Sequence, residues 1–350
     1  MMRAVVVENA KAPVREAMRV VANYPRPELT PSHNVLVKVH YTAVNRADLM
    51  QRQGKYPPPP GASSVLGLEC SGEIVEVGTQ SSAPSRSSKW KPGDRVMGLL
   101  EGGGYAEYAA CAPGSLMRVP DKWSLEQAAC VPEVWLTAYQ LLRKVAKTQP
   151  GDNVLLHAGA SAVSLAAIQL ARHVLQAKHV TALTRSARKL DQCKQMGADE
   201  ALLREDFFAN FRTEDAEAKN ALTKFDVVLD PVVGEDFFTC LSEATNRDAR
   251  YVVYAAMGGP KVPDFNFGPV FRKSLSILTS TLRARSVDYK ADLIEMFEEE
   301  VLQPFLVDAG SKAELNLDTV LALDQVAEAH ERLESNDTGG KIVLKVAAEE

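Results

Sequence analysis

The chain has 350 residues, and a typical domain length of roughly 150 residues predicts about two domains. Hydrophobic residues make up 46% and charged residues 24%, so the composition is that of an ordinary globular protein and excludes a disordered or fibrous chain. The formal net charge of −5 provides no overall positive field, which argues against nucleic acid as the main partner.

The cysteines and the apolar stretches bear on the cellular compartment. Five cysteines lie far apart and none belongs to a C-x-x-C pair, so neither a disulfide framework nor a zinc knuckle is indicated. Glu8 interrupts the short apolar run at the N-terminus, and no stretch approaches the roughly 18 apolar residues of a membrane span. We therefore expect no membrane association and a cytoplasmic location.

Short strands fill the first part of the chain. In HNVLVKVHY, Val35, Val37 and Val39 alternate with the residues between them, and EIVEVG, DRVMGLL and YAEYAAC follow as further short runs between turns. This spacing predicts a compact antiparallel β domain. The proline run at 56–61 and the serine-rich stretch at 80–93 are expected to be loops.

A helical region follows these strands. Ser124 and Gln127 have the spacing of a capping box, in which each side chain binds a free backbone N–H of the first helical turn. Pro132 must interrupt or restart that helix, because proline lacks the N–H that a helix interior requires.

Strands and helices alternate from Asp152 onward. The apolar runs NVLLHA, HVTALT, FDVVLD and RYVVYA are separated by helix-like segments such as SLAAIQLARHVL and ARKLDQCKQM. This order is typical of a parallel sheet covered by helices on both faces, and it predicts a doubly wound α/β domain over residues 136–285. A helix ADLIEMFEEEVLQPF and a second one after Asp324 follow, and the final strand GKIVLKV could return to the first domain.

The turn after the first strand of this series is a candidate phosphate-binding loop. Such a turn carries glycines so that the backbone and the start of the next helix can approach a pyrophosphate. In HAGASAVSLAAIQL, Gly159 fits the first glycine of G-x-G-x-x-G, but Ser161 and Ser164 stand at the other two positions. The strand–turn–helix context supports a dinucleotide site, and the alternative is a domain that has lost tight nucleotide binding.

The end of the second strand distinguishes between cofactors. NAD enzymes place an acid there for the ribose hydroxyls, whereas a 2′-phosphate requires positive charge and donors. The segment Thr184-Arg-Ser-Ala-Arg-Lys189 contains no acid, and Arg185, Ser186 and Lys189 are candidate phosphate ligands. The sequence therefore favours NADP(H), while Arg188 fits a solvated position better.

Several motifs together resemble one family. They are VNRADLMQRQGKYPPPPGASSVLGLECSGEIVEVG at 44–78, EGGGYAEY, VPEVWLTAYQLL, AAMGG, TSTLRARS and GKIVLKV. These resemble the zinc-independent, zeta-crystallin-like quinone oxidoreductases of the medium-chain dehydrogenase/reductase superfamily, over nearly the whole chain. The resemblance implies a GroES-like catalytic domain (1–135 and 286–350), a Rossmann domain (136–285) with a cofactor cleft between the two, NADPH-dependent quinone reduction and a homodimer.

Comparison with the zinc alcohol dehydrogenases of the same superfamily predicts that no metal is bound. Their catalytic zinc is held by cysteine, histidine and a third ligand, and the matching positions here carry Asn45, Leu68 and Glu133. An amide and a leucine cannot replace a thiolate and an imidazole, so a closed zinc site is not expected. The serine-rich loop takes the place of the cysteine-rich structural-zinc lobe.

The resemblance also assigns site residues. Asn45 and Tyr56 are the candidate catalytic residues, although Asn45 could simply cap a turn and Tyr56 could be a packing aromatic. Lys341 is a weaker cofactor candidate, since an exposed lysine before a strand is common. Glu69 and Glu133 could form an acid/base pair, but nothing in the sequence places them together. Both are therefore expected to have structural roles, with Glu69 bonding within its loop and Glu133 near the floor of the cleft. The predicted cofactor-binding residues are Asn45, Thr137, Gly159, Ala160, Ser161, Ala162, Val163, Arg185, Ser186, Lys189, Met257, Gly258, Gly259, Leu282, Arg283 and Lys341.

Two other functions compete with quinone reduction. One is NADPH-dependent reduction of an activated alkene such as an enone or enal. The other is a nucleotide-binding redox sensor whose catalysis has been lost through Ser161, Ala162 and Ser164.

Overall fold

The computed structural model describes residues 1–80, 84–212, 217, 222–308, 313–336 and 338–347. The chain divides into two compact units. Unit 1 contains Met1–Leu136, Leu282–Glu299 and Leu315–Glu350, and unit 2 contains Thr137–Thr281 and Glu300–Glu314. The α/β fold with one unit inserted into the other agrees with the predicted GroES-like and Rossmann domains. Leu136 and Leu282–Arg285, predicted within the Rossmann domain, belong to unit 1, whereas residues 300–314, predicted within the GroES-like domain, belong to unit 2.

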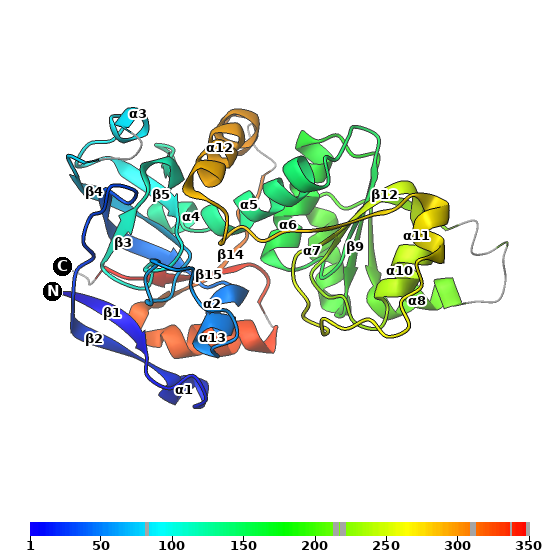
Figure 1. Cartoon of the computed structure of the whole chain (residues 1–350), viewed down its shortest axis with the longest axis horizontal. Helices are drawn as coiled ribbons and strands as arrows, with labels where there is room; N and C mark the ends of the chain where they lie inside the picture. Colours follow the sequence, from blue (N-terminus) through cyan, green and yellow to red (C-terminus); the bar gives the residue numbers. More distant parts are fainter. Residues whose placement is uncertain (81–83, 213–216, 218–221, 309–312, 337, 348–350) are drawn as a thin grey trace. The chain divides into compact units, whose positions relative to one another are not determined.

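Unit 1 is built on a seven-stranded sheet. Its strand order is β14-β15-β3-β4-β5-β7, with β6 also paired to β3, and a separate hairpin joins β1 to β2. The antiparallel pairing of β15 with β3 confirms that the final strand returns to the first domain (Figure 1). The strands are β1 Met2–Val7, β2 Met18–Tyr24, β3 Val35–Ala43, β4 Glu69–Val77, β5 Arg95–Leu99, β6 Tyr108–Cys111, β7 Leu116–Arg118, β14 Leu317–Ala322 and β15 Lys341–Lys345.

Short helices surround this sheet. The capping box predicted at the start of α4 is present, because the Ser124 hydroxyl accepts from the Gln127 N–H and the Gln127 side chain accepts from the Ser124 N–H. Pro132 restarts the helix as α5, as its sequence position predicts. The helices are α1 Val14–Ala17, α2 Arg46–Arg52, α3 Pro84–Ser87, α4 Leu125–Ala128, α5 Pro132–Tyr139, α12 Val287–Phe297 and α13 Val326–Ser335.

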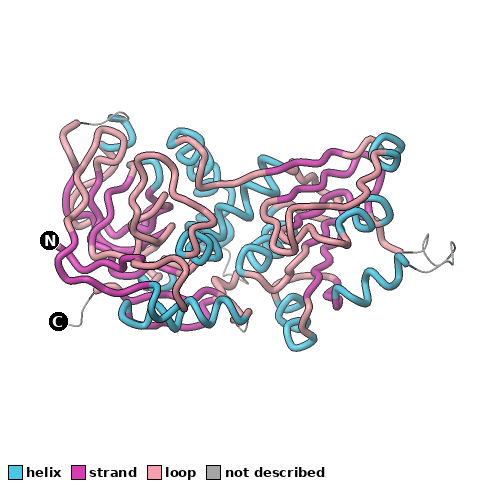
Figure 2. The backbone as a smooth tube through the Cα atoms, turned by 60° about the horizontal axis from the view of Figure 1, so that its bottom comes forward, coloured by secondary structure: helices cyan, strands magenta, loops and turns pink. Residues whose placement is uncertain are grey.

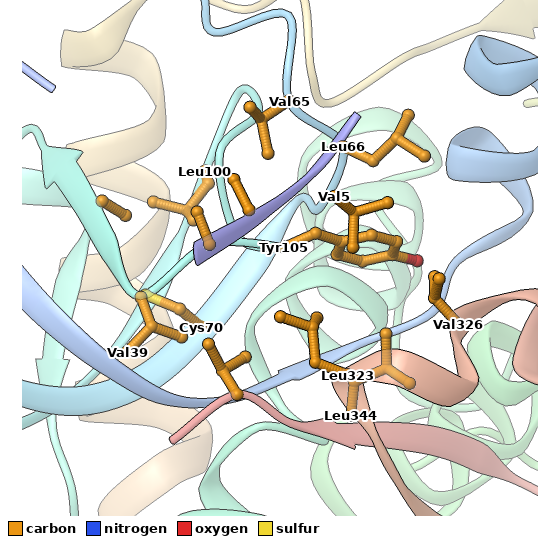
Figure 3. Close-up of a cluster of buried hydrophobic side chains, with 14 of the residues drawn as sticks. Val5, Val39, Val65, Leu66, Cys70, Leu100, Tyr105, Leu323, Val326 and Leu344 are labelled. Carbon is orange, nitrogen blue, oxygen red and sulfur yellow. The ribbon is translucent and has the colours of Figure 1, made fainter. Parts of the chain in front are cut away.

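The core of unit 1 is organised around Tyr105. Its ring is fully buried among aliphatic side chains that include Val5, Leu66 and Leu344 (Figure 3). The Tyr105 hydroxyl lies 3.2 Å from Nε2 of His330 on α13. The alternating valines of β3 and Val326 of α13 belong to this same buried cluster, so the core joins the sheet to α13.

Unit 2 is a parallel sheet with the strand order β10-β9-β8-β11-β12-β13. This order reverses between β8 and β11, as in doubly wound dinucleotide-binding folds. Helices lie on both sides of the strands (Figure 2). The elements are β8 Asn153–Leu156, α6 Ala162–Gln169, β9 His179–Thr184, α7 Leu190–Gln195, β10 Glu200–Leu203, α8 Arg204–Arg212, β11 Phe225–Asp230, α10 Phe237–Glu243, β12 Thr245–Val253, α11 Gly268–Lys273 and β13 Ser276–Thr279.

The predicted long helix ADLIEMFEEEVLQPF changes geometry along its length. It begins as α12 and continues as a π-helical stretch over Glu298–Val307. In that stretch the Glu300 carboxylate accepts hydrogen bonds from the Tyr139 hydroxyl (2.7 Å) and from Arg143 (2.9 Å), both of unit 2. These bonds attach Glu300 to unit 2, although the sequence predicted it in the GroES-like domain. Among the described residues, no helix is both long and apolar enough to span a bilayer.

Candidate functional site

A buried ion pair forms the base of the site in unit 1. Lys341 Nζ donates to Glu69 Oε1 and to Asn45 Oδ1, each at 2.6 Å. Glu69 is 0% exposed and Lys341 is 2% exposed. The expectation of an exposed lysine is therefore wrong, because the pairing of β15 with β3 carries Lys341 into the interior. The expectation that Glu69 bonds within its own loop is also wrong.

Asn45 is held from several sides. Its backbone N–H donates to Asp48 Oδ2 at 2.8 Å at the start of α2, and its side-chain amide donates to Glu69 Oε1 at 2.8 Å. With Lys341 on its Oδ1, the amide orientation is fixed by charged partners. Asn45 therefore stands at the N-cap position of α2. Its contact with a cofactor stays a prediction.

Glu133 lies against the same base. The backbone N–H of Glu133, at the start of α5, donates to Glu69 Oε2 at 2.9 Å, so the fold joins two carboxylates that sequence reasoning left apart. Glu133 is partly exposed. Burial, and next the negative charge of Glu69, raise the pKa of Glu133 to about 8. A carboxyl with this pKa is mostly protonated at neutral pH.

Asp48 is a second perturbed carboxyl that sequence reasoning missed. It is 0% exposed, and it accepts hydrogen bonds from the backbone N–H groups of Asn45 and Gly67. Burial raises the pKa of Asp48 to about 6, against the opposing effect of those two hydrogen bonds. The N-x-x-D spacing of a helix start was the sequence signal that could have identified it.

Tyr56 and Arg283 form the rim of the unit 1 site. The Arg283 guanidinium lies 5.4 Å from the centroid of the Tyr56 ring, within the range of a cation–π contact. Arg283 is 4% exposed and donates to the Glu101 carbonyl and to Gln51 Oε1, while its Nη1 has no hydrogen-bond partner among the described residues. Leu282 beside it is buried. The structure therefore places two predicted residues from distant segments together.

In unit 2, hydroxyl groups occupy the glycine positions of the predicted phosphate-binding loop. Ser161 caps α6, with its Oγ accepting from the Ser164 N–H at 3.3 Å and donating to Ser164 Oγ at 3.0 Å. Ser164 Oγ in turn donates to the His157 carbonyl at 3.1 Å. These bonds accommodate both serines, and they close the turn before the start of α6, where Ala162 and Val163 are half-buried.

The first glycine of the loop is required by packing. A Cβ on Gly159 would lie 2.7 Å from the Cβ of Ala182 on β9, and Ala158 before it has a left-handed φ of 49°. Ala160 is buried beside it. The loop thus keeps the close strand–helix approach of a dinucleotide-binding turn although two of its three glycines are replaced.

The other predicted cofactor residues of unit 2 follow strand ends. Arg185 is exposed after β9, Ser186 and Lys189 are half-buried, and the Ser186 N–H donates to Thr184 Oγ1 at 3.2 Å. After β12, the backbone N–H groups of Met257 and Gly258 donate to carbonyls of the loop after β11. Gly259 has a φ of +109° that favours glycine. Thr137 lies half-buried on α5.

A second polar cluster of unit 2 is fully enclosed. His157 Nε2 lies 3.4 Å from Cys240 Sγ, and the Tyr251 hydroxyl donates to Asp230 Oδ2 at 2.8 Å. All four side chains are at most 1% exposed. Burial raises the pKa of the Cys240 thiol and lowers that of His157, so neither group is a reactive ion near neutral pH.

The residues at the catalytic-zinc positions do not fit a zinc ion. Leu68 is buried and apolar, the Asn45 amide is committed to charged partners, and the Lys341 ammonium already neutralises Glu69. Zinc requires deprotonated N, S or O ligands in a tetrahedral arrangement. Within the described part of the chain, no group of three or more His, Cys, Asp or Glu side chains is arranged to hold a metal.

Comparison with known families agrees with this architecture. Residues 31–121 match the alcohol dehydrogenase GroES-like domain, and residues 162–299 match the zinc-binding dehydrogenase family. The chain belongs to the medium-chain dehydrogenase/reductase superfamily. Quinone oxidoreductase-like protein 2 of Bos taurus is 35% identical over 242 residues, which cover 66% of this chain and 64% of that protein. The superfamily consists of oxidoreductases that bind nicotinamide cofactors.

Solved structures cover the chain more completely. A mycobacterial protein, Rv1454c, solved in complex with NADPH, has a TM-score of 0.78 and 26% identity over 99% of this chain and 100% of its own. An NAD-dependent alcohol dehydrogenase has a TM-score of 0.77 and 29% identity, with the same coverage. The matched part of the chain covers less than two thirds of the length of the first curated relatives. For a polyketide synthase of Mycobacterium marinum, it covers 12% of that protein.

Proposed function

We propose that the chain is a zinc-free, NADPH-dependent quinone reductase. The observation that carries the proposal is the buried Lys341–Glu69–Asn45 network, because it engages Asn45, which stands at one of the positions that hold the catalytic zinc in related dehydrogenases. An ordinary carbonyl must be polarised by a Lewis acid before it accepts a hydride easily. A quinone accepts electrons readily and needs no such polarisation. Within the zeta-crystallin-like group, we infer a resemblance to the tumour-suppressor-inducible quinone oxidoreductase from motifs that extend over nearly the whole chain.

The residues of unit 2 fit a dinucleotide. Bound NADPH would supply the hydride, and the protein would supply binding and orientation. Gly159–Val163 and the start of α6 would hold the pyrophosphate, while Arg185, Ser186 and Lys189 would hold the 2′-phosphate. The absence of an acid after β9, together with exposed Arg185, supports NADPH over NADH.

The cofactor proposal is tested by replacing Arg185 with alanine. A lost charge-assisted hydrogen bond of about 1.5–3 kcal/mol corresponds to about a 10- to 150-fold weaker NADPH affinity. NADH affinity should stay unchanged, and Arg188→Ala serves as the matched control on the same helix start. Titration by nucleotide fluorescence measures both. Equal losses for the two nucleotides would contradict a 2′-phosphate site at Arg185.

The acceptor site is proposed around Asn45 and Tyr56 in unit 1. Tyr56 is half-buried and its ring is held by Arg283, so its phenol offers a donor to an acceptor oxygen. Enone or enal reduction is the alternative, because the same groups suit a conjugated carbonyl. A panel of quinones and enones with NADPH separates these two activities, and NADPH binding without turnover of any acceptor would favour the redox-sensor alternative.

A homodimer and a cytoplasmic location complete the proposal. Strand β13 lies at the edge of the unit 2 sheet, Ile277 on it is 38% exposed, and Phe271 before it is 78% exposed. An apolar edge strand with unpaired backbone groups is suited to pairing with the same strand of a second copy. Ile277→Lys should shift the sedimentation coefficient to that of a monomer, and a wild-type monomer would contradict the dimer. All five cysteines are buried and free, in keeping with the cytoplasm.

A further inference from the structure

We propose that Glu133 is the general acid that protonates the reduced acceptor. This inference rests on the proposed function and extends it, because sequence reasoning assigned Glu133 only a structural role. Two-electron reduction of a quinone needs a hydride and a proton. Bound NADPH would supply the hydride, so a protein group or water must supply the proton.

The fold holds Glu133 in place while leaving its carboxyl available. Its backbone N–H is anchored to Glu69 Oε2 at 2.9 Å, which fixes the start of α5. The residue is half-buried, and among the described residues its carboxyl accepts no hydrogen bond. By contrast, both oxygens of the Glu69 carboxylate are occupied by Lys341, Asn45 and Glu133 itself. The acid that can reach an acceptor is therefore Glu133.

Charged groups from every neighbouring segment act on Glu133. Glu69 on β4 and Asp48 on α2 oppose its ionisation, whereas Lys341 on β15 and Arg283 favour it. The negative charges and burial dominate, and the pKa is raised to about 8. Burial raises the pKa of the half-buried Tyr56; Arg283 opposes this rise and the charge of Glu133 adds to it. Glu133 is thus mostly protonated at neutral pH, and the Glu69 carboxylate, which binds both the Glu133 N–H and the Asn45 amide, joins it to the proposed acceptor site.

A buried orphan group marks the same place. Arg283 is 4% exposed, yet its Nη1 has no hydrogen-bond partner in the described chain. Leaving a buried donor unsatisfied costs free energy, which a bound acceptor oxygen or a water would recover. The Arg283 guanidinium lies 5.4 Å from the centroid of the Tyr56 ring, so this donor belongs to the proposed acceptor site.

The proposed step balances. A quinone that accepts a hydride becomes a hydroquinone anion, and this anion takes the proton of the Glu133 carboxyl. The carboxyl O–H bond breaks, a hydroquinone O–H bond forms, and Glu133 is left as a carboxylate. Because Glu133 is partly exposed, water then returns a proton to it. For an enone, the same proton would go to the carbanion or enolate.

The test compares Glu133→Gln with Glu16→Gln, a control at an exposed first-turn glutamate of α1. A methylated quinone gives a weakly acidic hydroquinone that needs a proton, whereas a tetrahalogenated quinone gives a strongly acidic one. E133Q should reduce turnover of the methylated quinone by about 10²-fold or more and that of the halogenated quinone far less. NADPH affinity and the thermal melt identify any variant that has not folded.

The pH profile distinguishes an acid from a structural residue. Wild-type turnover of the methylated quinone should fall as the pH rises above about 8, and E133Q should lose that break. Tyr56→Phe should keep it. A break that persists in E133Q but disappears in Y56F would overturn the inference and make Tyr56 the acid, and wild-type rates in E133Q would overturn it outright. A wild-type protein that reduces no quinone would instead refute the proposed function.

Discussion

Each unit contains a cluster of polar side chains in its interior, and the two clusters differ in how completely they are buried. In unit 1, Lys341 and Glu69 form a closed base, but Tyr56 and Glu133 are only partly buried. In unit 2, Asp230, Tyr251, His157 and Cys240 are all at most 1% exposed. From this difference in burial we expect chemistry at the unit 1 cluster and a purely structural role for the unit 2 cluster.

The largest expected effect comes from removing the cation of the unit 1 base. Lys341→Met leaves the Glu69 carboxylate buried without its counterion, which should lower the free energy of unfolding by about 3–5 kcal/mol. Urea denaturation measures this change. The double variant K341M/E69Q should recover most of the loss, since it removes both charges. A K341M variant as stable as wild type would contradict a buried Lys341–Glu69 ion pair.

The partly exposed end of the unit 1 cluster predicts a pH-dependent stability. Glu133 has an unfolded pKa near 4.3 and a folded pKa of about 8, so its ionisation opposes folding and stability falls as the pH rises between these values. Glu133→Gln removes that effect. Its stability relative to wild type should increase from pH 5 to pH 8 and then level off, reaching about 2–4 kcal/mol. A difference that does not vary with pH, measured by thermal melts, would contradict the raised pKa.

Breaking the enclosed cluster of unit 2 should have a smaller and purely structural effect. Tyr251→Phe removes the 2.8 Å hydrogen bond to Asp230, at a cost of about 1–2 kcal/mol in the free energy of unfolding. Turnover of NADPH and quinone should not change at a temperature where the variant is folded. A large loss of turnover with normal stability would mean that the enclosed cluster takes part in the chemistry.

An exposed ion pair gives the smallest expected effect and calibrates the buried one. Arg15 binds Glu331 through its Nε at 2.9 Å, with the arginine side chain 74% exposed. Arg15→Ala should change the free energy of unfolding far less than K341M does, and added salt should reduce the difference. A loss comparable to that of K341M would remove the distinction between the two pairs.

Local patterns predicted most of the fold. The apolar runs around Val154, Val180 and Val228 gave β8, β9 and β11, and Ser124 with Gln127 gave the cap of α4. The short strands β10 and β13 were not predicted, because residues such as Glu200 and Ser276 give no alternating pattern. The change to a π-helix after Phe297 depends on contacts of Glu300 with a distant segment, which no local pattern contains.

The candidate site was predictable only in part. The resemblance named Asn45, Tyr56, Arg283 and Lys341, and the fold brings all four into unit 1. The interior position of Lys341 could not be deduced, because its partner Glu69 lies 272 residues away in the chain. Likewise, the raised pKa of Glu133 comes from burial and from Glu69, and neither is visible in the local sequence.

Steady-state oxidation of NADPH by a quinone, on protein dialysed against a zinc chelator, is the most direct test of the central claim. The expected result is undiminished turnover with one hydroquinone formed for each NADPH, and a lower rate with NADH. Activity that disappears on chelation and returns with added zinc would contradict the account, as would the absence of NADPH oxidation at saturating nucleotide.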